Sequence, residues 1–248
     1  MDDRQIRKVD LTGSSTVRIP IDPEDLSPAP EAVARYFGGP DYQLSPKTHQ
    51  RICEGIHQAV GMVKPVVSYR AIPIEKIESV CGIVLSDGAY ADILPDPRDD
   101  PMDNQARYLA VYVGTLGSAL ETTCRDLAKR GRLYQSLLLD AVGTAMLDAM
   151  ASICDGLVDI HSQQLGLFTG CRLGPGLNGI ALESQALIFD LLGGESAGVH
   201  LNESFIMRPA KSISAFVIYS DSEQEKNPGS KCLQCEMKHC QFRSTRPL

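Results

Sequence analysis

Three features are missing from this 248-residue sequence, and each absence excludes a class of protein. No run of about 20 uninterrupted apolar residues occurs, so we expect no membrane-spanning segment and no membrane partner. Positive charge is scarce: 24 Lys and Arg residues face 31 Asp and Glu residues, for a formal net charge of −7. This balance argues against nucleic acid as a partner, because phosphate binding needs a basic surface. The N-terminal MDDRQIRKVD lacks the apolar stretch of a secretory signal, which predicts a cytoplasmic protein.

Common hydrolytic sites are missing too. The five histidines show no His-Glu-x-x-His spacing, and no Ser/His/Asp set is evident. Hydrophobic residues make up 43% of the chain and charged residues 22%, as in ordinary globular proteins, and this length can bury a core without disulfides. Five of the eight cysteines are scattered singly and are expected to be reduced core residues.

The hydrophobic pattern predicts long helices and a few strands. Ser45 and Pro46 mark the start of one helix, as N-cap and first helical residue. Helices are predicted at residues 31–37, 46–63, 118–129, 133–160 and 182–192, and strands at residues 15–21, 66–74, 108–113, 199–201 and 213–219. Because these elements do not alternate strictly, the order predicts an α+β fold rather than a doubly wound sheet.

Changes in composition divide the chain into three parts. Residues 91–106 form an acidic, proline-rich connector without periodicity. We expect residues 1–105 to be the N-terminal portion of a single domain and residues 106–220 to be its core with a ligand loop. Residues 221–248 are expected to form a polar linker and a cysteine-rich tail.

A glycine-rich loop at residues 169–179 is the first candidate binding element. Gly174, Gly176 and Gly179 satisfy the G-x-G-x-x-G pattern of dinucleotide-binding loops. The context argues against that reading, because the fingerprint normally sits in a βαβ unit and Pro175 removes one N–H group from the phosphate cradle.

Arg172 suggests a different ligand for the same loop. Its guanidinium group can donate two parallel hydrogen bonds to a carboxylate, while neighbouring glycines let a ligand approach the backbone closely. The amino-acid portion of S-adenosylmethionine suits such a site. On composition alone, a plain surface turn with an exposed arginine is the favoured interpretation of this segment.

The order of two motifs resembles the reactivation domain of cobalamin-dependent methionine synthase. Arg172-x-x-x-Gly176 is followed by a predicted helix and then by LNESFIMRPAKSIS at residues 201–214. The family has an Arg-x-x-x-Gly-Tyr motif, a helix, and then stretches similar to Leu-Thr-Glu-Ser, Met-x-Pro and Ser-Val-Ser. The resemblance covers about residues 108–219. It implies a mixed, mainly antiparallel twisted sheet with long helices packed against it.

The resemblance also implies a ligand and residue roles. In that family the domain binds S-adenosylmethionine beside the corrinoid, and its methyl group traps reduced cobalt as methylcobalamin after cob(II) has received an electron. Arg172 would contact the ligand's carboxylate, and Gly174 and Gly176 would allow close approach. Asp148 stands where the family has a glutamate that meets the amino group. Leu177 replaces the family's tyrosine, so an aromatic contact and a hydroxyl are missing.

The corrinoid is expected to come with another protein. The sequence has no Asp-x-His-x-x-Gly loop to supply a lower axial ligand. The expected partners are a corrinoid-binding protein, or a methionine synthase without its own activation domain, and an electron donor. Glu203, Ser204, Lys211 and Ser212 are expected to face the corrinoid.

The tail carries a possible metal site in Cys232, Cys235 and Cys240. Two-residue spacing lets two thiolates meet one ion, and Cys171 could complete a zinc or iron–sulfur set. Reduced thiols in an unstructured tail, or a redox pair, are the alternative. A rival function follows from the same tail: a non-catalytic regulatory or assembly protein for a corrinoid or methyltransferase system, with a metal- or redox-sensing function.

Overall fold

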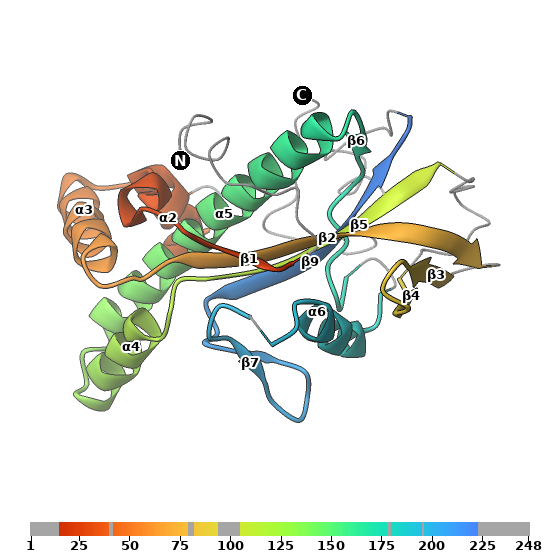
Figure 1. Ribbon diagram of the computed structural model, residues 1–248. Coiled ribbons are helices and arrows are strands. Elements are labelled where there is room, and N and C mark those ends of the chain that lie inside the picture. The colour runs from red at the N-terminus through yellow and green to blue at the C-terminus, as the bar shows by residue number, and fades with distance from the viewer. Residues whose placement is uncertain are drawn as a thin grey trace.

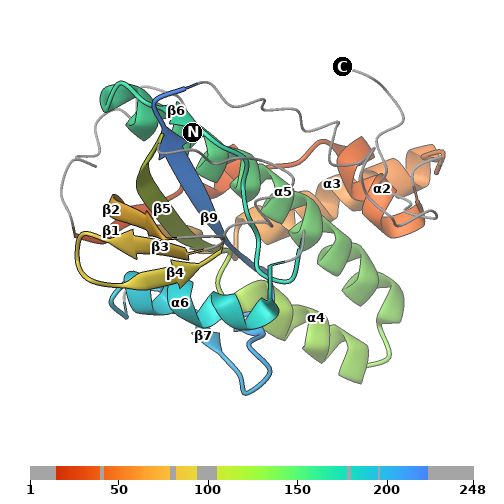
Figure 2. The ribbon, with the colours of Figure 1, turned by 90° about the vertical axis from the view of Figure 1, so that its right-hand side faces the viewer.

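The protein is seen in a computed structural model that describes residues 15–39, 42–78, 82–93, 105–177, 180–194 and 196–222. Within these ranges the chain forms one large curled sheet and a small hairpin (Figure 1). The long helix α5 (Leu133–Gln164) crosses one face of the sheet, and the short helix α6 (Gln185–Leu191) lies on the other (Figure 2). The predicted α+β fold with a mainly antiparallel sheet is confirmed.

The large sheet has seven strands, in the order β4-β3-β2-β5-β9-β6 with β1 paired to β2. Their bounds are β1 Val17–Pro20, β2 Val66–Glu78, β3 Gly82–Leu85, β4 Tyr90–Asp92, β5 Ala106–Thr115, β6 Phe168–Thr169 and β9 Ser212–Ser220. Each pairing between these strands is antiparallel. Strands β7 (His200–Leu201) and β8 (Met207–Arg208) form the separate hairpin.

The helices gather mainly at one end of α5. Their bounds are η1 Pro23–Leu26, α2 Pro30–Gly38, α3 Pro46–Val60, α4 Ala119–Lys129, α5 Leu133–Gln164, η2 Leu182–Ser184 and α6 Gln185–Leu191. The predicted cap of α3 is confirmed, because the Ser45 hydroxyl accepts a hydrogen bond from the Thr48 N–H at 3.2 Å. Helices α2, α3 and α4 each contact α5, so α5 is the centre of the helical layer.

The central strands β2, β5 and β9 separate two apolar cores. Side chains alternate between the faces of a strand, so neighbouring residues enter different cores. Tyr69, Tyr112 and Tyr219 enter the core against α5, whereas Val111 and Phe216 enter the core against α6. Both faces are therefore apolar, and the site described below lies where the α5 side reaches the edge of β9.

Helix α5 is long and apolar enough, by length and composition, to cross a membrane. Half of its most apolar window is buried within the fold, and the helix contacts α2, α3, α4, β5 and β9. A helix that packs against neighbours on most of its sides has the composition of a core helix, so the apolar character of α5 is explained by burial.

One hairpin is absent from the sequence-based prediction. Strands β3 and β4 are joined by a tight turn in which Gly88 has φ +83° and the Leu85 N–H bonds the Ala89 carbonyl at 2.8 Å. The predicted connector at residues 91–106 was therefore wrong at both ends, since Ala91 belongs to β4 and Ala106 to β5. Strands of three or four residues carry too few alternations to be recognised by period.

Candidate functional site

The glycine-rich loop is held along the edge of β9. The backbones of Leu173 and Phe216 exchange two hydrogen bonds of 2.9 Å, and the Gly170 N–H bonds the Ile218 carbonyl at 2.8 Å. The segment after β6 therefore continues as an irregular edge beside β9. This pairing fixes the backbone of Arg172 next to the face of the sheet that α5 covers.

Arg172, the residue expected to hold the ligand's carboxylate, contacts a carboxylate of α5. Its Nη1 lies 3.4 Å and 3.5 Å from the two carboxylate oxygens of Asp155. The two side chains are 43% and 49% exposed. A long, solvent-exposed pair of this kind contributes between about 0 and 1 kcal/mol to stability, so little free energy opposes its rearrangement.

Tyr112 lies under this pair, with its hydroxyl buried. Among the described residues, Tyr112 and Ser68 are the ones whose buried hydroxyls have no hydrogen-bond partner of standard geometry. Burial raises the pKa of Tyr112 most, Cys154 and Asp155 raise it further, and the nearby Arg172 cation lowers it. Burial also raises the pKa of the Cys154 thiol. Both groups are therefore neutral near pH 7, and Arg172 and Asp155 are the charges at this site.

Asp148 lies on the same face of α5 as Asp155 but contacts a different neighbour. It precedes Asp155 by seven residues, which is about 10 Å along the helix axis. Its carboxylate accepts a hydrogen bond from the Tyr36 hydroxyl of α2. Burial, together with this bond, raises the pKa of Tyr36 to about 12. The structure thus does not pair Asp148 with Arg172, and the sequence reasoning missed Asp155, although residues i and i+7 share a helix face.

The glycines shape the loop beyond Arg172. Gly176 has φ +80°, a conformation that side-chain-bearing residues rarely adopt, and its N–H bonds the Ile180 carbonyl at 2.9 Å. At Gly174, an added Cβ would come within 3.2 Å of a methyl group of Leu177. Leu177 itself is 63% exposed. The loop therefore presents glycine backbone and one exposed leucine beside Arg172.

The four residues expected to face a corrinoid have different environments. Glu203 and Ser204 are exposed between β7 and β8. By contrast, Lys211 contacts Asp140 at 2.9 Å and Thr144 at 2.8 Å, and the buried Ser212 hydroxyl bonds Thr115 and the Pro209 carbonyl, each at 2.8 Å.

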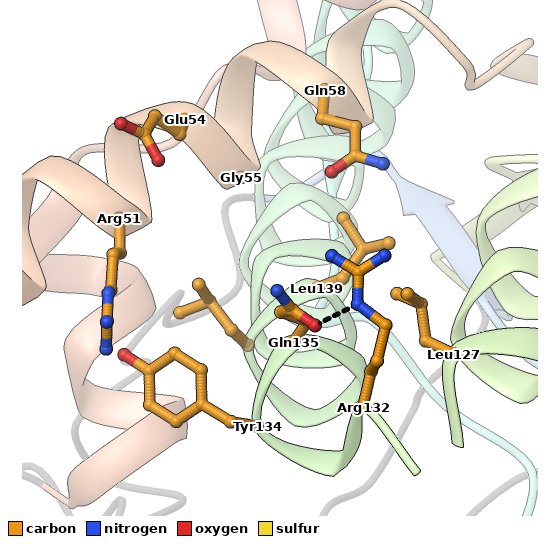
Figure 3. A pocket seen from close by; sticks show the side chains of 10 residues that line it. Arg51, Glu54, Gly55, Gln58, Leu127, Arg132, Tyr134, Gln135 and Leu139 are labelled. Atoms are coloured by element: carbon orange, nitrogen blue, oxygen red, sulfur yellow. Dashed lines mark hydrogen bonds between the residues drawn. The ribbon is translucent and has the colours of Figure 1, made fainter. Parts of the chain in front are cut away.

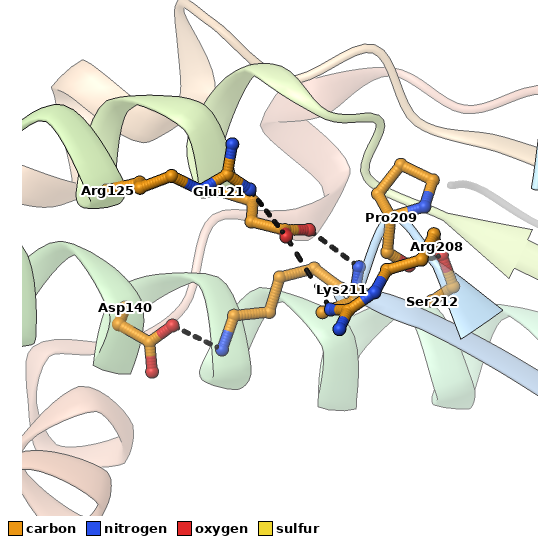
Figure 4. A network of polar contacts seen from close by, with 8 residues as sticks. Glu121, Arg125, Asp140, Arg208, Pro209, Lys211 and Ser212 are labelled. Atoms are coloured by element: carbon orange, nitrogen blue, oxygen red, sulfur yellow. Dashed lines mark hydrogen bonds and ion pairs between the residues drawn. The ribbon is translucent and has the colours of Figure 1, made fainter. Parts of the chain in front are cut away.

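The side chain of Glu121 in α4 holds the segment between β8 and β9 in place through hydrogen bonds and ion pairs (Figure 4). Its carboxylate accepts the Ala210 N–H at 2.7 Å, and it contacts Arg125 at 3.0 Å and Arg208 at 3.7 Å. Lys211 reaches across to α5 in the same view. This end of the motif that begins at residue 201 is therefore anchored to both helices.

The expected metal ligands are not assembled in the described part of the chain. Cys171 is a partly exposed free thiol, and no group of three or more possible ligands lies together among the described residues. The expected ligands Cys232, Cys235 and Cys240 lie outside those residues.

Comparison with known proteins gives a similarity in structure. No protein-family model matches the sequence, and no curated protein sequence is significantly similar to it. The fold is similar to a solved structure of the MetH reactivation domain bound to AdoHcy, with a TM-score of 0.60 and 12% sequence identity. The match covers 85% of this chain and 80% of that one.

The chain therefore has the fold of the methionine synthase reactivation domain, and the resemblance drawn from the sequence is confirmed at the level of the fold. At 12% identity the match establishes architecture, and function has to be argued from the residues of the site.

Proposed function

We propose that this chain binds S-adenosylmethionine beside Arg172 and Asp155 and supports the reductive remethylation of a corrinoid carried by a separate protein. One observation carries the proposal: in a reactivation-domain fold, the glycine-rich loop places Arg172 beside Asp155 of α5. The similar structure contains AdoHcy, the product that remains when S-adenosylmethionine has given up its methyl group. This supports the methyl donor as the ligand of the present chain.

The charges of the site suit the amino-acid portion of that ligand. A guanidinium group can donate two parallel hydrogen bonds to a carboxylate, and a neighbouring carboxylate can accept from an ammonium group. Arg172 and Asp155 supply one group of each kind and are both about half exposed. Because their mutual contact is long and exposed, exchanging that contact for one with the ligand costs little. Exposed Gly176 leaves the backbone open to close approach.

The proposed reaction asks for positioning rather than acid–base catalysis. One electron from a separate donor reduces cob(II)alamin to cob(I)alamin. Its cobalt attacks the methyl carbon, the carbon–sulfur bond breaks, and S-adenosylhomocysteine leaves as methylcobalamin forms. The protein has to hold the donor in line with the cobalt and keep water away. Leu177 offers an apolar contact in place of the family's tyrosine, so no hydroxyl at that position takes part.

The partner and the location belong to the same proposal. The corrinoid comes with a corrinoid-binding protein or with a methionine synthase that lacks an activation domain, and the reaction takes place in the cytoplasm. Of the four expected contacts, the exposed Glu203 and Ser204 are the ones that a partner can touch directly. We assign Lys211 and Ser212 to positioning that surface, since their polar atoms are already bonded.

Calorimetry with S-adenosylmethionine tests the proposal. We expect saturable binding at one site, and Arg172→Ala should weaken it by about tenfold or more, because a hydrogen bond to a charged group contributes about 1.5–3 kcal/mol. Arg107→Ala is the matched control, since Arg107 also forms a half-exposed ion pair with an aspartate, Asp221. Its affinity should equal that of the unmodified protein.

Two outcomes would contradict the assignment. Unchanged affinity in Arg172→Ala would show that the ligand sits elsewhere. No binding of either S-adenosylmethionine or S-adenosylhomocysteine, with or without added corrinoid protein, would favour the regulatory or assembly role.

A further inference from the structure

A hollow lies far from the glycine-rich loop, between α3, the C-terminal part of α4 and the first turns of α5 (Figure 3). Its volume is about 540 Å³, which is within the range of small-molecule sites. Leu127, Leu138 and Leu139 supply an apolar wall, and Gly55 lines the α3 side.

Two guanidinium groups from different elements line this hollow. Arg51 belongs to α3 and lies over the ring of Tyr134, 5.1 Å from its centroid. Arg132 precedes α5, and its Nε donates to Gln135 Oε1 at 2.5 Å. Neither arginine forms an ion pair with another residue in the described ranges. Both side chains are therefore held in place while their charge stays available.

The local charge favours an anion. Glu54 is the one acidic residue lining the hollow, and its carboxylate accepts a hydrogen bond from Gln50 at 2.9 Å. Two cations against one anion leave a positive excess in a chain whose net charge is −7. Helix α5 begins here without a side-chain cap, and the positive end of its dipole adds to this potential.

We infer that this hollow binds a small organic anion with two or more negative charges, whose carboxylate or phosphate groups meet Arg51 and Arg132 while an apolar body lies on the leucine wall. An arginine fork matches either oxyanion. S-adenosylmethionine does not fit this description, because its sulfonium gives it a net positive charge near pH 7. The ligand is thus a different molecule from the one proposed for Arg172.

Titrations of the full chain followed by ¹H–¹⁵N NMR test the inference. Citrate, inorganic pyrophosphate and adenosine monophosphate are the probes, with sodium chloride added to the reference sample to match ionic strength. At least one probe should saturate with a Kd of about 1 mM or tighter and shift the amides of residues 132–139. Preference for citrate would identify a carboxylate ligand, and preference for the other two a phosphate ligand.

Substitutions separate a built site from general charge attraction. Arg51→Ala and Arg132→Ala should each weaken binding about tenfold, and Arg132→Lys should recover only part of the loss, because lysine lacks the planar fork. Arg130→Ala is the matched control: it removes an exposed arginine two residues away that does not line the hollow. Thermal unfolding checks that each variant is folded.

The inference is wrong if no probe saturates up to about 10 mM, a concentration that corresponds to negligible affinity. It is equally wrong if Arg130→Ala weakens binding as much as Arg132→Ala does. Neither result bears on S-adenosylmethionine binding, which is measured through Arg172.

Discussion

Asp155, rather than Asp148, should meet the ammonium group of S-adenosylmethionine. Of these two aspartates, Asp155 is the one that contacts Arg172, which is proposed to hold the carboxylate of the same amino-acid moiety. Asp148 lies about 10 Å nearer the N-terminus of α5 and accepts a hydrogen bond from Tyr36. We therefore compare Asp155→Asn with Asp148→Asn, two changes that remove the same charge from one helix face.

Two opposing effects set the change in S-adenosylmethionine affinity that Asp155→Asn should cause. Loss of a hydrogen bond between charged groups weakens binding by about 1.5–3 kcal/mol. Asp155→Asn also removes the Arg172–Asp155 ion pair from the unbound protein. This pair then no longer competes with the ligand, which favours binding by about 0–1 kcal/mol. The difference spans about 0.5–3 kcal/mol, and the midpoint of about 1.75 kcal/mol corresponds to a roughly twentyfold rise in Kd. Asp148→Asn should change Kd less than about twofold, since the Tyr36 hydroxyl can still donate to the amide oxygen.

Calorimetric titration of both variants with S-adenosylmethionine decides the matter, and urea unfolding provides the control. Both variants should unfold within about 0.5 kcal/mol of the unmodified protein, as expected for exposed positions. A large loss of affinity in Asp148→Asn with none in Asp155→Asn would refute the reasoning from the Arg172 contact. That result would instead support Asp148, the residue that the family resemblance indicated, as the contact of the ammonium group.

Three further predictions concern other parts of the chain. Burial lowers the pKa of His161, which bonds Tyr69, so the unfolded state binds a proton that the folded state does not. Stability should fall as the pH drops below about 6.5, and His161→Gln should flatten this dependence in urea unfolding at pH 5–8. Glu121→Ala should cost about 1–3 kcal/mol in the same assay, because the Ala210 N–H and two arginines lose their acceptor, whereas Glu54→Ala should be nearly neutral. If the tail cysteines bind a metal, anaerobically purified protein should contain stoichiometric iron or zinc, and Cys232→Ser with Cys235→Ser should abolish it.

The regular parts of the fold follow from local sequence signals. Ser45 and Pro46 define the start of α3, and the apolar runs of β5 and β9 mark the centre of the sheet. The shortest strands cannot be predicted from local sequence. β6 and β8 have two residues each, and they are strands because they pair with other strands. Their formation depends on tertiary contacts, which no local period encodes.

The residues of the candidate site likewise fall into two groups: those that the local sequence indicates and those that only the tertiary structure brings together. Arg172 and Gly176 could be found from the sequence because they share one loop and one motif. Asp155 could not, since its role depends on how α5 crosses the sheet and on the register of Leu173 with Phe216. Correspondence with a family's glutamate pointed to Asp148, yet at low identity a helix can bring a different acid to the same partner. The spatial neighbour is the better guide here, because an ammonium group is recognised by the carboxylate it can reach.

Helix α5 carries residues of both proposed sites, and its length explains why they can be tested separately. Asp155 follows Gln135 by 20 positions, so the two lie about 30 Å apart along the axis. At this separation no single small ligand can touch both Arg132 and Arg172, and exposed charges so far apart are screened at physiological salt. Any influence of one site on the other would have to pass through the packing of α5 against the sheet, where Tyr112 and Met150 are fully buried. With no shared ligand and with the charges screened, binding at one site is expected to leave the affinity of the other unchanged.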